Sequence, residues 1–135
     1  MYLKKHLDFA ELPDWLSFLQ KDLDLKGVGI GIAKLPAGKG YTYLHSHKQQ
    51  EEVYIPLAGK GIIHVDGTDI PLQPGDFVKV SPEAKRALKA VGDSKLVCLI
   101  VGGVPGGFSH RKTSNALIDD GILDREHPAP WYKNS

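Results

Sequence analysis

The stretch that decides the fold is YTYLHSHKQQEEVY, residues 41–54. Its first half is predicted to be an extended strand, and a second strand is predicted over 52–57 after a short turn. Alternate side chains of a strand share one face, so His45 and His47 are expected to be neighbours, with Glu52 across the turn. Two neutral imidazoles and a carboxylate brought together across a hairpin form a three-ligand set for a divalent transition metal, with positions left open for water or substrate.

A simpler interpretation of these residues competes with a metal site. Two histidines at a strand end can be solvated, and Glu51 and Glu52 can be an exposed acidic pair. The full spacing favours the metal site, since four residues separate His-x-His from Glu52 and six more separate Glu52 from Gly59. Aromatic side chains that share the predicted face either line a pocket or pack the interior. They are Tyr41, Tyr43 and Tyr54.

The surrounding chain predicts an all-β fold. From residue 27 to residue 101, short β-branched and aromatic runs alternate with glycine and proline turns, as in an antiparallel barrel or sandwich. The remaining predicted strands cover 28–35, 61–65, 76–80, 86–91 and 96–101. His64 follows two glycines on one of them and is not expected to be a ligand.

We expect one domain over residues 1–135, with an N-terminal helical segment (1–26), a barrel (27–103) and an extended tail (104–135). Leucines recur at three- and four-residue steps within Asp8–Leu25, which predicts an amphipathic helix packed against the body. The tail has little periodicity and is expected to wrap the body or a partner subunit.

The segment from Val28 to Val101 resembles the small single-domain cupins. The spacing of His45, His47, Glu52 and Gly59 matches the first cupin motif. The resemblance implies a double-stranded β-helix barrel of jelly-roll type, with a metal in its lumen. It also implies that these histidines and Glu52 are the ligands; Glu51 would leave seven residues before the glycine.

The second cupin motif is degenerate here. The chain has Arg86 where the family expects a histidine, and no histidine occurs between His64 and His110. A guanidinium cannot ligate a metal. Either Arg86 points into the lumen and holds a carboxylate or phosphate of a ligand, which its planar fork suits, or it is a surface arginine on the barrel rim.

Composition excludes several classes of partner. Lysine and arginine number 17 against 16 acidic residues, for a net charge of +1, and no basic field favours nucleic acid. No apolar run approaches the length of about 20 residues that spans a bilayer, and no secretory signal is present, so a cytoplasmic location is expected. The single cysteine, Cys98, is expected to be buried.

The function predicted from these observations is binding of a divalent metal, such as iron, manganese, zinc or nickel, and of a small anionic organic molecule in the lumen. If the protein is an enzyme, the resemblance implies a metal-dependent dioxygenase, isomerase or epimerase. The alternative is a non-catalytic cupin that binds a sugar or organic acid with a weak or lost metal site. A homodimer is expected, built from the apolar helix and the Pro-Trp-Tyr tail.

Overall fold

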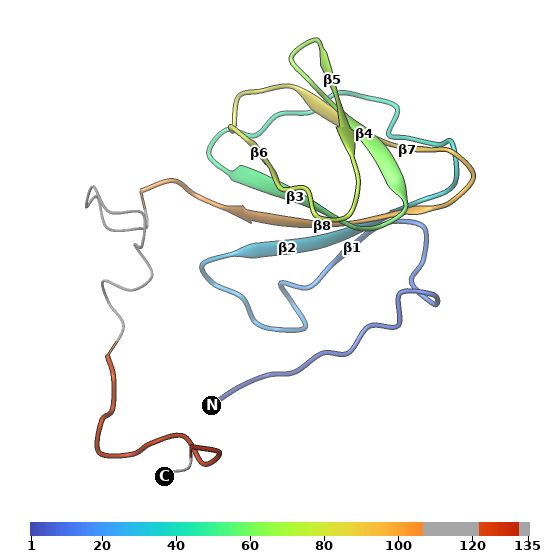
Figure 1. Ribbon diagram of the computed structural model, residues 1–135. Helices are drawn as coiled ribbons and strands as arrows, with labels where there is room; N and C mark the ends of the chain where they lie inside the picture. Colours follow the sequence, from blue (N-terminus) through green and yellow to red (C-terminus); the bar gives the residue numbers. More distant parts are fainter. Residues whose placement is uncertain (107–121, 133–135) are drawn as a thin grey trace. The chain divides into compact units, whose positions relative to one another are not determined.

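The computed structural model describes residues 1–106 and 122–132 of the chain. Its contacts divide it into two units, Met1–Pro105 and Gly106–Ser135, and the first unit carries all eight strands (Figure 1). Within the described residues no helix forms. The all-β fold class is therefore confirmed.

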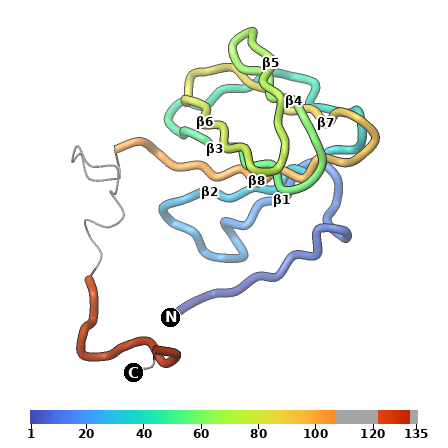
Figure 2. Tube along the Cα trace, viewed as in Figure 1, coloured from blue at the N-terminus to red at the C-terminus, as the bar shows by residue number. Residues whose placement is uncertain are grey.

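Two antiparallel sheets form the walls of the barrel (Figure 1). The larger has five strands in the order β1-β2-β8-β3-β6, and the smaller has three in the order β5-β4-β7. The strands are β1 (Trp15–Phe18), β2 (Gly29–Leu35), β3 (Glu51–Ala58), β4 (Lys60–Val65), β5 (Thr68–Leu72), β6 (Val78–Val80), β7 (Arg86–Val91) and β8 (Leu96–Gly103). The chain changes sheet between β3 and β4 and again at each connection from β5 to β8, a path that can be followed in Figure 2.

The core lies between the two sheets, and both sheets contribute side chains to it. Leu35, Leu96 and Cys98 of the five-stranded sheet pack in one buried cluster with Ile63 and Leu88 of the three-stranded sheet. Each of these side chains is at most 2% exposed. Burying one large apolar side chain contributes roughly 1.5–3 kcal/mol, so this cluster holds the two sheets together.

The predicted helix over Asp8–Leu25 is wrong. Part of this segment is β1, which pairs antiparallel with β2. Its Leu16 and Phe18 are two residues apart and lie on one face, where a Cβ at Gly31 would be 3.3 Å and 3.6 Å from their Cδ1 atoms. The open edge of β2 offers unpaired backbone donors and acceptors, and pairing with them overrides the local helical spacing of the leucines.

The strand predicted over residues 41–47 is wrong as well, because the segment forms no regular strand. It runs beside β7 but pairs with it only at two isolated bridges, Gly40 with Lys89 and His45 with Arg86. At the second bridge each backbone N–H donates to the other residue's carbonyl, at 3.0 Å and 2.9 Å. This bridge fixes His45 directly beside the start of β7.

Strand β5 is absent from the sequence prediction, and it contains Pro71, a residue that argues against a strand. A proline removes a donor from a ladder, so it is tolerated at a sheet edge. β5 is the edge strand of the three-stranded sheet, and Pro71 lies opposite Ile62 of β4. The predicted strand over 76–80 is present only as Val78–Val80.

The tail lies mostly outside the described residues, which end at 106 and resume over 122–132. In the resumed part, the Asp124 carboxylate accepts hydrogen bonds from the backbone N–H groups of Glu126 and His127, both at 3.2 Å. Wrapping of the body by the tail stays a prediction. Across the described ranges, no helix has the length and apolar character that a bilayer crossing requires.

Candidate functional site

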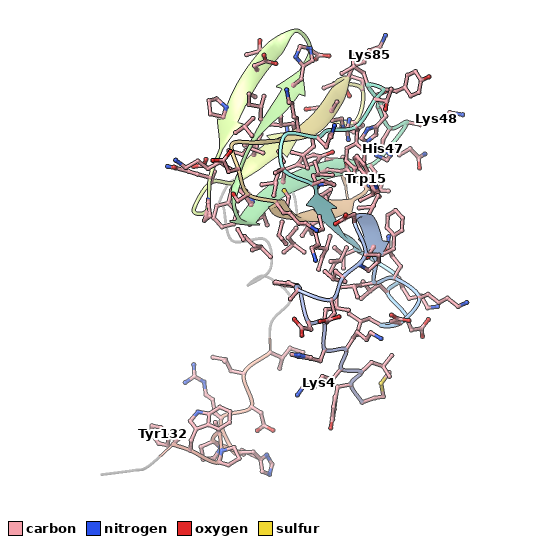
Figure 3. All side chains as sticks on the ribbon, turned by 90° about the vertical axis from the view of Figure 1, so that its right-hand side faces the viewer. Lys4, Trp15, His47, Lys48, Lys85 and Tyr132 are labelled. Atoms are coloured by element: carbon pink, nitrogen blue, oxygen red, sulfur yellow. The ribbon has the colours of Figure 1, made fainter. Side chains whose placement is uncertain are left out.

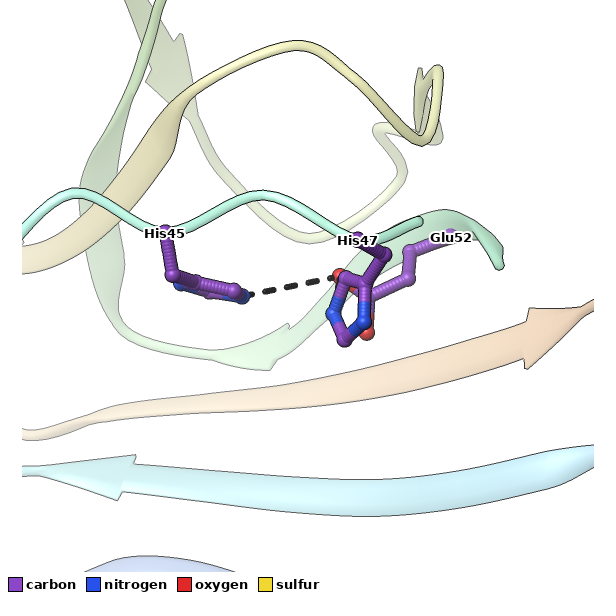
Figure 4. A group of neighbouring side chains, drawn as sticks. All are labelled: His45, His47 and Glu52. Carbon is purple, nitrogen blue, oxygen red and sulfur yellow. Dashed lines mark ion pairs between the residues drawn. The ribbon is translucent and has the colours of Figure 1, made fainter. Parts of the chain in front are cut away.

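Three side chains that the sequence grouped together meet in the structure. Glu52 stands on β3, and His45 and His47 stand on the segment beside β7. One potential ligand atom from each lies within 4.8 Å of the other two. The Nε2 atoms of His47 and His45 are 3.5 Å and 3.9 Å from Oε1 of Glu52, and Figure 4 shows both rings turned toward this carboxylate.

These distances suit a shared metal ion. Bonds of about 2.1 Å from one ion to imidazole nitrogen and carboxylate oxygen separate neighbouring ligand atoms by about 3–3.5 Å. The two imidazole rings stand nearly perpendicular, with an interplanar angle of 84°. Burial and the nearby Arg86 guanidinium lower the pKa of His45, which favours the neutral imidazole that metals bind. The three residues could therefore hold a divalent ion with little rearrangement.

The Glu52 carboxylate is surrounded by donors from the chain itself. Its Oε1 accepts hydrogen bonds from Arg86 Nη2 at 2.7 Å and from the Tyr54 hydroxyl at 2.9 Å, and its Oε2 accepts one from Gln50 Nε2 at 3.1 Å. Burial alone would raise the pKa of Glu52, but the hydrogen bonds from Arg86 and Tyr54 outweigh it and hold the pKa below its ordinary value. Glu52 is thus an ionised carboxylate fixed in place.

Arg86 lies in the interior of the barrel, at the start of β7, and is 0% exposed. This burial excludes the surface position on the rim. Its Nη1 donates to the carbonyl oxygens of Ser81, Pro82 and Ala84, at 3.3 Å, 3.1 Å and 2.7 Å. Three carbonyls and one carboxylate therefore hold the guanidinium, and its contact with a ligand anion stays a prediction.

A cavity of about 590 Å³ adjoins the three-residue group, and His45, His47 and Glu52 form part of its wall. Most of the remaining wall is apolar or aromatic, with a few amides. It includes Leu16, Phe18, Gln20, Tyr41, Tyr43, Gln50, Tyr54, Leu88 and Ile100. Figure 3 shows His47 on the same side of the barrel as Trp15, the first residue of β1. The cavity combines a polar group with apolar walls, as small-molecule sites do.

The three predicted tyrosines all border this cavity but differ in role. Tyr54 is 2% exposed and donates to Glu52, so it both lines the cavity and orients the site. Tyr41 packs against Trp15 with ring centroids 5.9 Å apart, and burial raises its pKa to about 12. Tyr43 is 82% exposed and contributes to the mouth rather than to the interior.

Sequence reasoning missed Gln50 and the glycine that accommodates it. Gln50 precedes Glu52 by two residues, and this spacing, typical of one strand face, was the available signal. A Cβ at Gly102 would lie 2.6 Å from Cδ and Nε2 of Gln50. Gly102 therefore makes room for the amide that holds Oε2 of Glu52. His64 lies apart from the site, with its Nδ1 2.6 Å from Oδ1 of Asp69.

Comparison with known proteins agrees with this architecture. The Cupin_2 family, a cupin domain, matches residues 31–102. A crystal structure of a cupin protein from Bacteroides fragilis superposes with a TM-score of 0.77 at 35% identity, covering 90% of this chain and 96% of that chain.

Two further relatives have names that describe a ligand or reaction. The oxalate-binding protein of Thermotoga maritima is 32% identical over 68 residues, or 50% of this chain and 55% of that protein. A structure titled putative sugar phosphate isomerase from Acidithiobacillus ferrooxidans has a TM-score of 0.58 at 31% identity, covering 65% of this chain and 57% of that chain. This chain thus spans little more than half the length of either relative. Since the family match covers more than half of the chain, and the barrel and first-motif residues agree with it, the protein belongs to the cupin family.

Proposed function

We propose that this protein binds a divalent transition metal through His45, His47 and Glu52 and holds a small anionic organic molecule in the adjoining cavity. The observation that carries the proposal is the convergence of three ligand atoms within 4.8 Å in the wall of a cavity of about 590 Å³. A two-histidine, one-carboxylate set leaves coordination positions for a second molecule.

The charge of the site favours an anion. An ion bonded to Glu52 Oε1 at about 2.1 Å would lie within about 5 Å of Arg86 Nη2, which is 2.7 Å from the same oxygen. At an effective dielectric of about 20, a divalent ion and a guanidinium at that separation repel by roughly 7 kcal/mol. Glu52 offsets part of this repulsion, and an anionic ligand offsets the rest.

The relatives' names point to the same chemical class. The name of the Thermotoga maritima protein contains oxalate, and that of the Acidithiobacillus ferrooxidans protein contains sugar phosphate. Both ligands are small anions. The apolar wall supplied by Leu16, Phe18 and Ile100 suits a ligand whose anionic end meets the polar group while its carbon skeleton meets these side chains.

When bound, a metal at this site would supply Lewis acidity, or in the case of iron a site for oxygen chemistry. The chain's own residues perform the positioning. Tyr54 and Gln50 hold the two oxygens of Glu52, and the backbone bridge to Arg86 holds His45. Turnover as a dioxygenase, isomerase or epimerase would use these same groups.

A second candidate function is metal-independent binding of a sugar or organic acid. The Arg86–Glu52 ion pair favours it, because the guanidinium of Arg86 already balances the charge of the Glu52 carboxylate. Tyr54 and Gln50 also donate hydrogen bonds to that carboxylate. In this case Arg86 takes the place of a metal cation in organising the site.

Melting temperatures distinguish the two functions. Protein stripped with a chelator is reloaded with Mn²⁺, Co²⁺, Ni²⁺, Zn²⁺ or Fe²⁺, with or without oxalate or a sugar phosphate, and is then freed of excess metal. Ligands that bind only the folded state raise the melting temperature. We expect metal to stabilise the wild type and a His64→Ala control but not His47→Ala. An equal metal response from His47→Ala would contradict the proposed site, and anion stabilisation of stripped protein alone would favour the second function.

We also propose a homodimer. The helix expected to support it is absent, but edge strand β1 exposes Trp15 and Phe18, at 43% and 64%. An edge strand with exposed apolar side chains is a natural place for a second copy to pair. A monomer by light scattering at micromolar concentration would contradict the dimer.

A further inference from the structure

The positive charge of Arg86 is held in place beside Glu52, and a metal ion bound at the proposed site would not move it away. The turn before β7 surrounds its Nη1 with the carbonyl oxygens of Ser81, Pro82 and Ala84. Its side chain is fully buried, and its Nε has no partner among the described residues. Swinging the guanidinium away would leave these carbonyls without their donor, so the charge stays beside Glu52.

The oxygen of Glu52 that faces the histidines is the one that Arg86 holds. Oε1 accepts from Arg86 Nη2 and from the Tyr54 hydroxyl, and both histidine Nε2 atoms also lie nearest to this oxygen. A carboxylate offers about four lone-pair sites, about two on each oxygen, and the hydrogen bonds from Arg86 and Tyr54 already occupy those of Oε1. A metal would therefore share Glu52 with Arg86, and Glu52 would be a weaker ligand than an unpaired carboxylate.

We infer that Arg86 is a positioning residue that makes metal binding depend on a dianionic co-ligand. The inference rests on the proposed function and specifies its ligand class. Arg86, which lies behind Glu52 and not in the cavity wall, contributes +1, Glu52 contributes −1 and a divalent ion adds +2, which leaves +2 beside a cavity with mainly apolar walls. A dianion brings this sum to zero, whereas a monoanion leaves +1. Small dicarboxylates and phosphate esters are the matching classes.

The dependence is reciprocal, because a ligand that raises metal affinity has its own affinity raised by the same factor. An uncharged residue at position 86 would let Glu52 act as a full ligand and would lower the site's charge by one. Metal would then bind more tightly alone and would gain less from a dianion.

The test is a calorimetric titration of stripped protein with Mn²⁺, in the presence of succinate, butyrate or neither. Succinate is a dianion of nearly the same size as the monoanion butyrate, and both chelate free Mn²⁺ weakly enough to be corrected for. We expect succinate to lower the Kd for Mn²⁺ by about tenfold or more and butyrate by less than about threefold.

Variants then assign the effect to Arg86. We expect Arg86→Gln to bind Mn²⁺ more tightly without anion and to lose most of the succinate effect, and Arg86→Lys to retain it. Lys89→Gln is the matched control, since it removes a positive charge from an exposed position of the same strand. Circular dichroism and melting temperature verify that each variant folds.

The wild-type titrations decide the inference even if Arg86→Gln does not fold. Equal lowering of the Mn²⁺ Kd by succinate and butyrate would overturn it and leave the metal site standing. A full succinate effect in folded Arg86→Gln would also overturn it. Absence of Mn²⁺ binding under every condition would overturn the proposed function along with it.

Discussion

The guanidinium Nη2 of Arg86 lies 2.7 Å from the carboxylate Oε1 of Glu52, and the two side chains are 0% and 7% exposed. Glu52 belongs to β3 of the five-stranded sheet and Arg86 to β7 of the three-stranded sheet. The ion pair therefore joins the two sheets through the barrel interior. It also connects the candidate metal ligands to the turn that precedes β7.

Breaking this pair should destabilise the fold. We expect Arg86→Met to lower the free energy of unfolding by about 3–5 kcal/mol, because it leaves Glu52 as a buried charge without its partner. Urea unfolding followed by circular dichroism measures the loss. The double variant Arg86→Met, Glu52→Leu should recover part of it, since no buried charge then remains. A single variant within about 0.5 kcal/mol of wild type would contradict this view of the pair.

Gly59 should tolerate no side chain. Its φ is +76°, and a Cβ there would collide with the carbonyl oxygen of Lys95. Gly67 is a matched control, since its φ is +85° but a Cβ would meet nothing within 4 Å. We expect Gly67→Ala to cost about 1–2 kcal/mol from backbone strain, and Gly59→Ala to cost clearly more. Equal melting temperatures for the two variants would show that the collision is relieved cheaply.

Gly102 should act on the site through Gln50. A methyl group at Gly102 must displace the Gln50 amide and so remove its hydrogen bond to Oε2 of Glu52. Loss of a group that orients a metal ligand typically weakens metal affinity by about 10–100-fold. We expect a loss of this order for Mn²⁺ in Gly102→Ala, measured by calorimetry. Gly103→Ala is the control because its Cβ would make only an ordinary contact, 3.7 Å from the carbonyl oxygen of Gly27. Equal Mn²⁺ affinities in the two variants would show that Gln50 does not support the metal site.

Cys98 should be unreactive in the folded protein. Burial raises the pKa of its thiol to about 12, and the side chain is 0% exposed. A raised pKa favours the neutral thiol, so almost no thiolate is present at pH 8, and the thiolate is the reactive species. We expect negligible labelling by an aromatic disulfide reagent at pH 8 and rapid labelling in denaturant. Labelling of native protein at the rate of a free cysteine would mean that β8 opens readily.

The barrel strands and the three-residue group were predictable because each has a local signal. β2, β3, β4, β7 and β8 appear as β-branched or apolar runs bounded by glycine turns, and the spacing of His45, His47 and Glu52 predicts their convergence. Whether they bind a metal stays a proposal.

The remaining features depend on contacts between distant residues. A helical spacing of leucines could not show that Leu16 and Phe18 would pair beside β2, because the partner edge is contributed by residues 29–35. Likewise, the fully buried position of Arg86 depends on Glu52, which lies 34 residues earlier in the chain. The sequence left its orientation open for this reason.

The metal content of untagged protein tests the central claim most directly. After reconstitution in the presence of succinate and removal of excess metal, elemental analysis should give about one divalent ion per chain for the wild type and for the His64→Ala control. His45→Ala and His47→Ala should each contain close to none. A wild type that holds no metal after reconstitution, or histidine variants that retain it in full, would contradict a metal centre formed by His45, His47 and Glu52.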